Sequence, residues 1–165
     1  MNHNQLLSSM ISYYAGDPAR IQHFIKVYQF AKLIGETEGL DNQTQNILET
    51  AAIVHDIGIK PAEQLYGKCD GPLQEKLGPA EAEKMLRKLG YEPAIIERVS
   101  FLVGHHHTYT NIDGIDYQIL IEADFLVNLY EDGLSRQNIE HAYTSIFQTN
   151  TGKELCVGMF GLLEK

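Results

Sequence analysis

The chain has 165 residues, 44% of them hydrophobic, which suits one domain with a core of ordinary size. Thirteen basic and 22 acidic side chains give a net charge of −9, so a nucleic-acid polymer would meet repulsion unless one face were locally basic. The two cysteines, Cys69 and Cys156, lie far apart without a CxxC spacing, which predicts reduced thiols and excludes a zinc knuckle.

The N-terminal segment MNHNQLLSSMISYYAGD lacks a basic region followed by an apolar stretch, and no run of about 18 apolar residues occurs in the chain. We therefore expect a soluble, cytoplasmic protein that has neither a membrane nor a nucleic-acid polymer as partner. The sequence leaves the oligomeric state open, a homodimer included.

Apolar residues recur at helical spacing almost throughout, whereas alternating strand-like runs are scarce, so the predicted fold class is all-α. The first long helix is expected from Asp17-Pro18 to about Leu40, with Asp17 as N-cap and Pro18 as its first residue. Asp41 is expected to cap a second helix, which Gly58 would close.

The stretch from residue 61 to residue 79 contains YGKCDGP and LGP and is predicted to be an irregular loop with at most one short helix. We expect five further helices, over residues 79–89, 92–105, 116–131, 135–147 and 152–163. No linker or internal repeat divides the chain. The prediction is one domain over residues 1–165, with the motifs within residues 21–129 and the helices of residues 135–163 packed on that part.

Three predicted helices place polar side chains on their apolar faces. His23 has hydrophobic residues four, seven, eight and eleven positions later, which places its imidazole on the inner face of the first long helix. His55 ends the apolar stripe of the next helix, and Asp56 follows it. Asp124, within YQILIEADFLVNLY, has apolar neighbours seven and four positions before it and three after it.

A shared metal ion explains these four side chains together. A lone ionised carboxylate on an apolar face costs several kcal/mol unless its charge is compensated, whereas a lone inward histidine is commonly a hydrogen-bonded core residue. One divalent ion can compensate two carboxylates and accept two neutral imidazoles. We therefore favour one metal bound by His23, His55, Asp56 and Asp124 over four independent structural roles.

The same residues carry a resemblance to a known family. His23, the HDIG segment containing His55 and Asp56, and Asp124 in IEADFL resemble the H…HD…D pattern of the HD-domain superfamily of metal-dependent phosphohydrolases. The similarity covers roughly residues 21–129. It implies a mostly helical fold in which these four residues bind one metal; Mn, Mg, Fe, Co, Ni and Zn all suit such ligands.

The triplet His105 to His107 cannot share one helix face, so at most two of the three rings can reach one site. Arg98 lies seven residues earlier, which favours His105 as the inward member if the helix persists. In HD enzymes with two metals, extra histidines near this place and in the loop after HDIG bind the second ion. Here that loop has no histidine, and Glu75 stands near the corresponding position. The possible second-metal ligands are thus Glu75, His105 and His106, but we favour one metal.

Phosphate-ester hydrolysis is the chemistry that this resemblance implies, and a metal on an open site suits it. Asp56 would bind the ion and polarise the attacking water, and His105 and His106 would lie near the substrate phosphate. Lys60 and Arg98 could hold phosphate oxygens; equally, both could be solvated surface charges.

The predicted function is a metal-dependent phosphohydrolase that acts on a small soluble phosphate ester, with a nucleotide as the first expectation. The chain contains no GxxxxGK[ST], GxGxxG, HExxH or GxSxG motif, and no Gly-Tyr-Pro element that would indicate a cyclic-dinucleotide phosphodiesterase. Two alternatives remain: a di-iron oxygenase of HD type, and a sensing or binding module that keeps the metal without turnover.

Overall fold

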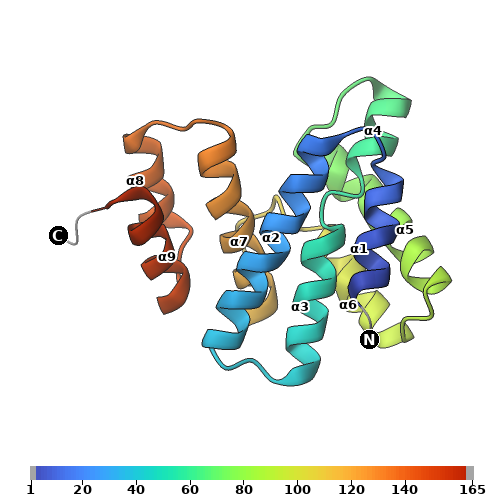
Figure 1. Cartoon of the computed structure of the whole chain (residues 1–165), viewed down its shortest axis with the longest axis horizontal. Helices are drawn as coiled ribbons and strands as arrows, with labels where there is room; N and C mark the ends of the chain where they lie inside the picture. The colour runs from blue at the N-terminus through green and yellow to red at the C-terminus, as the bar shows by residue number, and fades with distance from the viewer. Residues whose placement is uncertain (1–2, 163–165) are drawn as a thin grey trace.

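The computed structural model describes residues 3–162, and within them every regular element is an α-helix, as predicted (Figure 1). The helices are α1 (His3–Tyr13), α2 (Pro18–Thr37), α3 (Asn42–Val54), α4 (Ile59–Tyr66), α5 (Gly71–Lys88), α6 (Pro93–Val103), α7 (Ile115–Glu131), α8 (Arg136–Ser145) and α9 (Asn150–Phe160). No helix within residues 3–162 combines the length and the apolarity needed to cross a membrane.

Helices α2, α3 and α7 form the centre of the molecule. In Figure 1 they stand side by side, with α1, α4, α5 and α6 at one end and α8 and α9 at the other. Helix α7 is the most deeply buried helix, and most of its side chains lie in the core. Polar side chains on the facing sides of these three helices therefore lie close to one another and away from bulk water.

The caps predicted for the first two long helices are confirmed. The Asp17 carboxylate accepts a hydrogen bond from the backbone N–H of Arg20, and Asp41 accepts from the N–H groups of Gln43 and Thr44. Each cap satisfies N–H groups that the first helical turn leaves without a partner. The starts of α2 and α3 thus follow from local sequence.

The predicted loop over residues 61–79 is wrong, and so is the helix start at Pro79. Helix α4 fills the beginning of this stretch, and α5 starts at Gly71, capped by Asp70, and continues through Pro79. A proline disfavours a helical residue before it by clashing with that residue's Cβ, and Gly78 has no Cβ. The glycine thus relieves the constraint that would otherwise end the helix.

Helix α1 was missed by the sequence analysis because its apolar stripe is short. Leu6 and Met10, four residues apart, are fully buried and pack in the core, where α1 contacts α3. That spacing was the available signal. The last predicted helix begins two residues earlier than expected, at Asn150, and its predicted end at Leu163 lies outside the described residues.

Gly58 has a role different from the predicted one. Helix α3 ends at Val54, and residues 55–58 form a turn that leads into α4. The backbone of Gly58 has an ordinary helical φ of −71°. A Cβ at this position would lie 2.6 Å from the Gln74 carbonyl oxygen and 2.9 Å from the Gly78 nitrogen. Glycine is required here because the turn touches the backbone of α5.

Candidate metal centre

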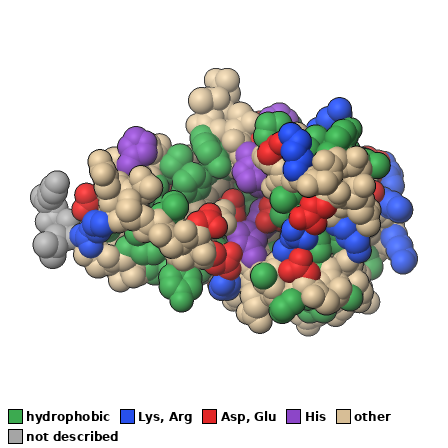
Figure 2. Space-filling view, turned by 90° about the horizontal axis from the view of Figure 1, so that it is seen from above, with side chains coloured by type: hydrophobic (Ala, Val, Ile, Leu, Met, Phe, Trp, Pro, Cys, Tyr) green, Lys and Arg blue, Asp and Glu red, His purple; other side chains and the backbone are tan. Residues whose placement is uncertain are grey.

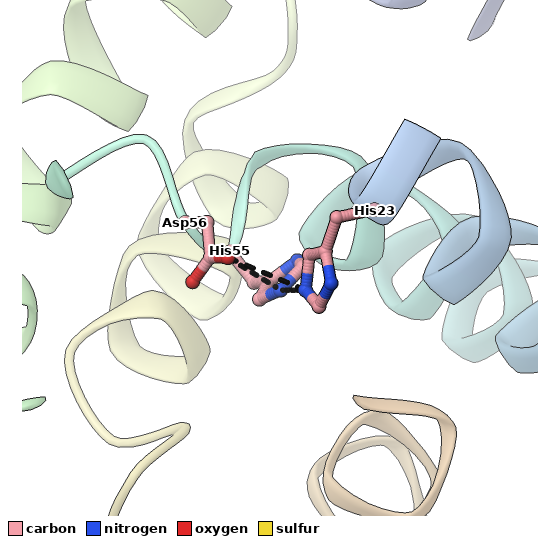
Figure 3. A group of neighbouring side chains, drawn as sticks. All are labelled: His23, His55 and Asp56. Carbon is pink, nitrogen blue, oxygen red and sulfur yellow. Dashed lines mark hydrogen bonds and ion pairs between the residues drawn. The ribbon is translucent and has the colours of Figure 1, made fainter. Parts of the chain in front are cut away.

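Four side chains from three parts of the fold converge beneath the surface. His23 projects from the second turn of α2, His55 and Asp56 lie in the turn after α3, and Asp124 lies in the middle of α7. Figure 3 shows the His23 ring pointing toward His55 and Asp56. This is the set of residues that the sequence analysis expected to share a metal.

The distances between the ligand atoms suit one ion. His23 Nε2 lies 3.2 Å from His55 Nε2, 3.3 Å from Asp56 Oδ2 and 3.2 Å from Asp124 Oδ1. His55 Nε2 lies 3.4 Å and 3.5 Å from the same two carboxylate oxygens. An ion that binds N and O atoms at about 2.0 to 2.2 Å keeps them about 3.0 to 3.5 Å apart. The residues therefore fit a metal.

In both His23 and His55, the ring nitrogen that faces away from the cluster, Nδ1, has a hydrogen-bond acceptor next to it. His23 Nδ1 lies 2.7 Å from Glu131 Oε2, and His55 Nδ1 lies 2.8 Å from the carbonyl oxygen of Ala52. Since both acceptors take a hydrogen from Nδ1, each neutral ring presents a lone pair on Nε2 to the cluster. Two lone pairs 3.2 Å apart repel unless a cation or a proton lies between them.

Charge interactions set the acidities in the cluster when no metal is bound. Burial alone lowers the pKa of His55, but the Asp56 carboxylate and the hydrogen bond to Asp124 outweigh it and raise that pKa well above 6.5. Burial raises the pKa of Asp56, yet the facing His55 and His106 rings hold it well below 3.8. The pKa of Asp124 is lowered in the same way by His23 and His55. The carboxylates thus stay anionic and attract a cation.

A second group shares Asp56. His106 lies in the turn after α6, only 1% exposed, and its Nε2 is 3.4 Å from Asp56 Oδ1. Its Nδ1 is 2.8 Å from the Val103 carbonyl oxygen, whereas Nε2, although buried, has no hydrogen-bond partner. His107 completes this group, in which one ligand atom from each of Asp56, His106 and His107 lies within 4.8 Å of the others. Asp56 thus offers one oxygen to each group.

His107 did not feature among the predicted site residues, and the inward placement of His105 is wrong. Helix α6 ends at Val103, so helical spacing does not extend to the triplet. The His105 ring stacks on Phe101 at 4.1 Å between centroids, and its Nδ1 bonds the Phe101 carbonyl. Burial and the neighbouring His106 lower the pKa of His107 to about 4. Gly104, which ends the helix, was the signal for this turn.

Two other predicted site residues, Lys60 and Arg98, bind other parts of the protein. Lys60 Nζ donates to the Tyr13 carbonyl oxygen at 2.7 Å, at the end of α1. Arg98 lies between Asp113 and Asp116 and bonds both carboxylates. Neither cation is placed with the ligand atoms.

Glu75 lies next to the histidine turn but holds its backbone. Its Oε1 accepts from the N–H of His107 at 3.0 Å and from the hydroxyl of Thr108 at 2.9 Å. The carboxylate therefore anchors the segment that carries His106 and His107. Glu75 belongs to neither group of metal-competent side chains among the described residues.

Tyr13, the last residue of α1, and Tyr14, which follows it, fix the turn that carries His55 and Asp56. The Tyr14 hydroxyl donates to the carbonyl oxygen of Asp56 at 2.7 Å, and the Tyr13 hydroxyl donates to that of Ile57 at 3.2 Å. These carbonyls lie beyond the end of α3, where the tyrosine hydroxyls supply donors from outside the helix. Helix α1, which the sequence analysis did not predict, thus supports the site directly.

The centre is open to solvent on the side of Asp56. The Asp56 side chain is 18% exposed, compared with 10% for His23 and 5% for Asp124. Histidine and acidic side chains gather in the middle of the face shown in Figure 2. A ligand could thus reach Asp56 while the other ligands stay beneath the surface.

Comparison with known proteins agrees with this geometry. The family model described as HD domain matches residues 20–141, which include all six residues of the two groups. No curated protein and no solved structure is significantly similar to the chain. The match spans well over half of the sequence, and the chain belongs to the HD-domain family.

Proposed function

We propose that this protein is a divalent-metal-dependent phosphohydrolase whose substrate is a small soluble phosphate ester, with nucleotides as the first class to test. The observation that carries the proposal is the convergence of two imidazoles and two carboxylates from α2, α7 and the turn after α3. The two imidazole Nε2 atoms lie 3.2 Å apart, and each lies 3.2 to 3.5 Å from one oxygen of Asp56 and one of Asp124. Family membership supports the reaction class, since HD domains are generally metal-dependent phosphohydrolases.

We also propose a second ion at Asp56, His106 and His107. The sequence analysis favoured one metal, but the shared carboxylate and the unpartnered Nε2 of His106 support a second cation at this place. Bound divalent ions would polarise the phosphate ester and activate water for attack on phosphorus. Mn, Mg, Fe, Co, Ni and Zn remain the candidate metals.

The chain's own residues would orient the reactants. Asp56 faces one group with Oδ2 and the other with Oδ1, so its carboxylate can bind a cation in each group. Because its pKa is held well below 3.8, it is a weak proton acceptor and serves by charge and position. The Nδ1–H of His106 donates to the Val103 carbonyl, which leaves the Nε2 lone pair to bind a cation or to accept a hydrogen bond. His107, with a pKa of about 4, is neutral at pH 7.

The test combines metal analysis with a phosphate-release assay on the same preparation. The protein is loaded with each candidate metal and incubated with nucleoside mono-, di- and triphosphates, sugar phosphates and p-nitrophenyl phosphate. Asp56→Ala should remove bound metal and phosphate release while circular dichroism shows a folded helical protein. Asp132→Ala removes an exposed carboxylate and should leave both unchanged.

Two outcomes would reject the proposal. Metal-loaded protein that releases phosphate from no ester would favour a binding module that lacks turnover. An iron-loaded protein that oxidises an organic substrate with O2, and hydrolyses no ester, would favour the oxygenase alternative.

A further inference from the structure

The amide of Gln74 lies between the start of α5 and the histidine turn. Its side chain is nearly buried, with the residue 7% exposed. The amide Nε2 donates to the Cys69 carbonyl oxygen at 2.8 Å, which fixes the direction of the group. The amide oxygen Oε1 then lies 3.1 Å from His107 Nε2. An amide oxygen can only accept, so this contact requires a hydrogen on His107 Nε2.

The neutral His107 ring therefore carries its lone pair on Nδ1. This is the reverse of His106, whose Nδ1–H donates to the Val103 carbonyl and whose Nε2 is free. Two successive histidines are thus held in opposite tautomers by two different acceptors. A metal ligand must present a lone pair, so the acceptor on the far nitrogen decides which atom can bind.

The neighbouring positions of α5 fix the same segment in other ways. Glu75 accepts from the backbone N–H of His107 and from the Thr108 hydroxyl. Gly71 leaves room for the ring, since a Cβ there would lie 3.1 Å from His107 Cγ. The first two turns of α5 thus form a frame for His107, and only Gln74 in this frame controls which ring nitrogen is protonated.

We infer that Gln74 is a positioning residue that holds His107 in the Nε2–H tautomer and so makes Nδ1 available to the second cation at Asp56 and His106. The inference rests on the proposed function for that second cation. It adds a role for a residue that is neither charged nor itself a ligand, on a helix that the sequence analysis took for a loop.

Two variants separate hydrogen bonding from packing. Gln74→Leu fills the space but offers His107 no acceptor, whereas Gln74→Glu loses the donor to the Cys69 carbonyl but keeps an acceptor oxygen opposite Nε2. Gln64→Leu, on the exposed face of α4, is the matched control. The first measurement is the tautomer of His107 in the metal-free full-length protein, read from long-range 1H–15N correlation spectra of the imidazoles. Wild type and Gln74→Glu should show Nε2–H, and Gln74→Leu a mixture.

The second measurement is titration of the metal-free proteins with Mn2+ by calorimetry. We expect Gln74→Leu to weaken the second binding event about 10- to 100-fold and to leave the first unchanged, the usual size of such an orienting effect. Gln64→Leu should stay within a few-fold of wild type, and Gln74→Glu, which keeps the acceptor and adds a negative charge, should not weaken the second event. Gln74→Leu with an unchanged second event, or an Nδ1–H tautomer of His107 in wild type, would overturn the inference.

Failure of this inference and failure of the proposed function give different experimental results. A wild-type protein that binds one Mn2+ and releases phosphate would overturn the inference and leave the phosphohydrolase intact. A protein that binds two ions with the expected Gln74 dependence but hydrolyses no ester would leave the inference standing and reject the reaction.

Discussion

Asp56 Oδ1 lies 3.4 Å from Nε2 of His106, a buried nitrogen with no hydrogen-bond partner. The other oxygen of the same carboxylate faces His23 and His55. One side chain therefore belongs to two groups of metal-competent residues. The turn that carries Asp56 points one of its oxygens toward each group.

The first prediction is that two neighbouring histidines, His105 and His106, differ in their effect on metal binding. His106→Ala should weaken the second metal-binding event by more than about 10-fold and lower turnover, because it removes the lone pair that faces Asp56. His105→Ala should leave metal affinity within a few-fold, because the His105 ring stacks on Phe101 and bonds a backbone carbonyl. Calorimetric titration and phosphate release check both. Equal losses in the two variants would contradict the structural assignment.

The second prediction concerns Glu131, which lies 2.7 Å from His23 Nδ1. Glu131→Ala should weaken the first metal-binding event about 10- to 100-fold, because the His23 ring loses the acceptor that orients it and fixes its tautomer. Glu131 also pairs with Lys26, so Lys26→Ala is the control: it removes a half-exposed partner and leaves the contact to His23. Metal affinity that falls equally in the control would point to a general charge effect instead.

The third prediction tests the close approach at Gly58. Gly58→Ala should lower the free energy of unfolding by about 1 to 3 kcal/mol, because its Cβ would meet the backbone of α5 at 2.6 Å. Gly158→Ala, on α9 with nothing within 4 Å of a Cβ, should instead raise stability by about 0.5 to 1 kcal/mol. Denaturant unfolding measures both, and a neutral Gly58→Ala would show that α5 can move away.

The fourth prediction concerns pH and the metal-free protein. The pKa values of His23 and His55 are raised above 6.5 in the folded protein, because nearby carboxylates outweigh the effect of burial. Such groups contribute stability that is fully present below the unfolded pKa of 6.5 and is lost as pH rises through the folded value. The melting temperature in chelator should therefore fall as pH rises above about 6.5.

Bound metal should abolish this alkaline loss, because the ion takes the place of the protons between the imidazoles and the carboxylates. The depressed pKa values of Asp56 and Asp124 act in the opposite range: their contribution is present above 3.8 and is lost as pH falls through the folded values. Thermal melts from about pH 5 to pH 9, with chelator and with metal, measure the difference. A melting temperature that rises with pH in chelator would contradict the prediction.

Much of the fold was predictable because it follows from local patterns. Apolar residues at helical spacing marked most of the helices, and Asp17 and Asp41 marked two of their starts. Local rules misplaced α5, because a proline normally ends a helix by clashing with the Cβ of the residue before it, and here that residue is Gly78, which has no Cβ. Helix α1 was not predicted because two buried residues make a weak pattern, although Tyr13 at its end and the adjacent Tyr14 hold the turn of the site.

The sequence by itself determined which residues converge in the candidate metal centre, because an imidazole or a carboxylate on an apolar face is costly unless it has partners. His23, His55, Asp56 and Asp124 satisfied that condition on three separate segments, and the fold brings them together. Only the tertiary structure decided which of the three consecutive histidines turns inward, because helical spacing stops at Val103 and the contacts of Gln74 and Glu75 on α5 orient the segment beyond it. Beyond the end of a helix, periodicity no longer says which way a side chain points, so contacts with another part of the chain must decide it.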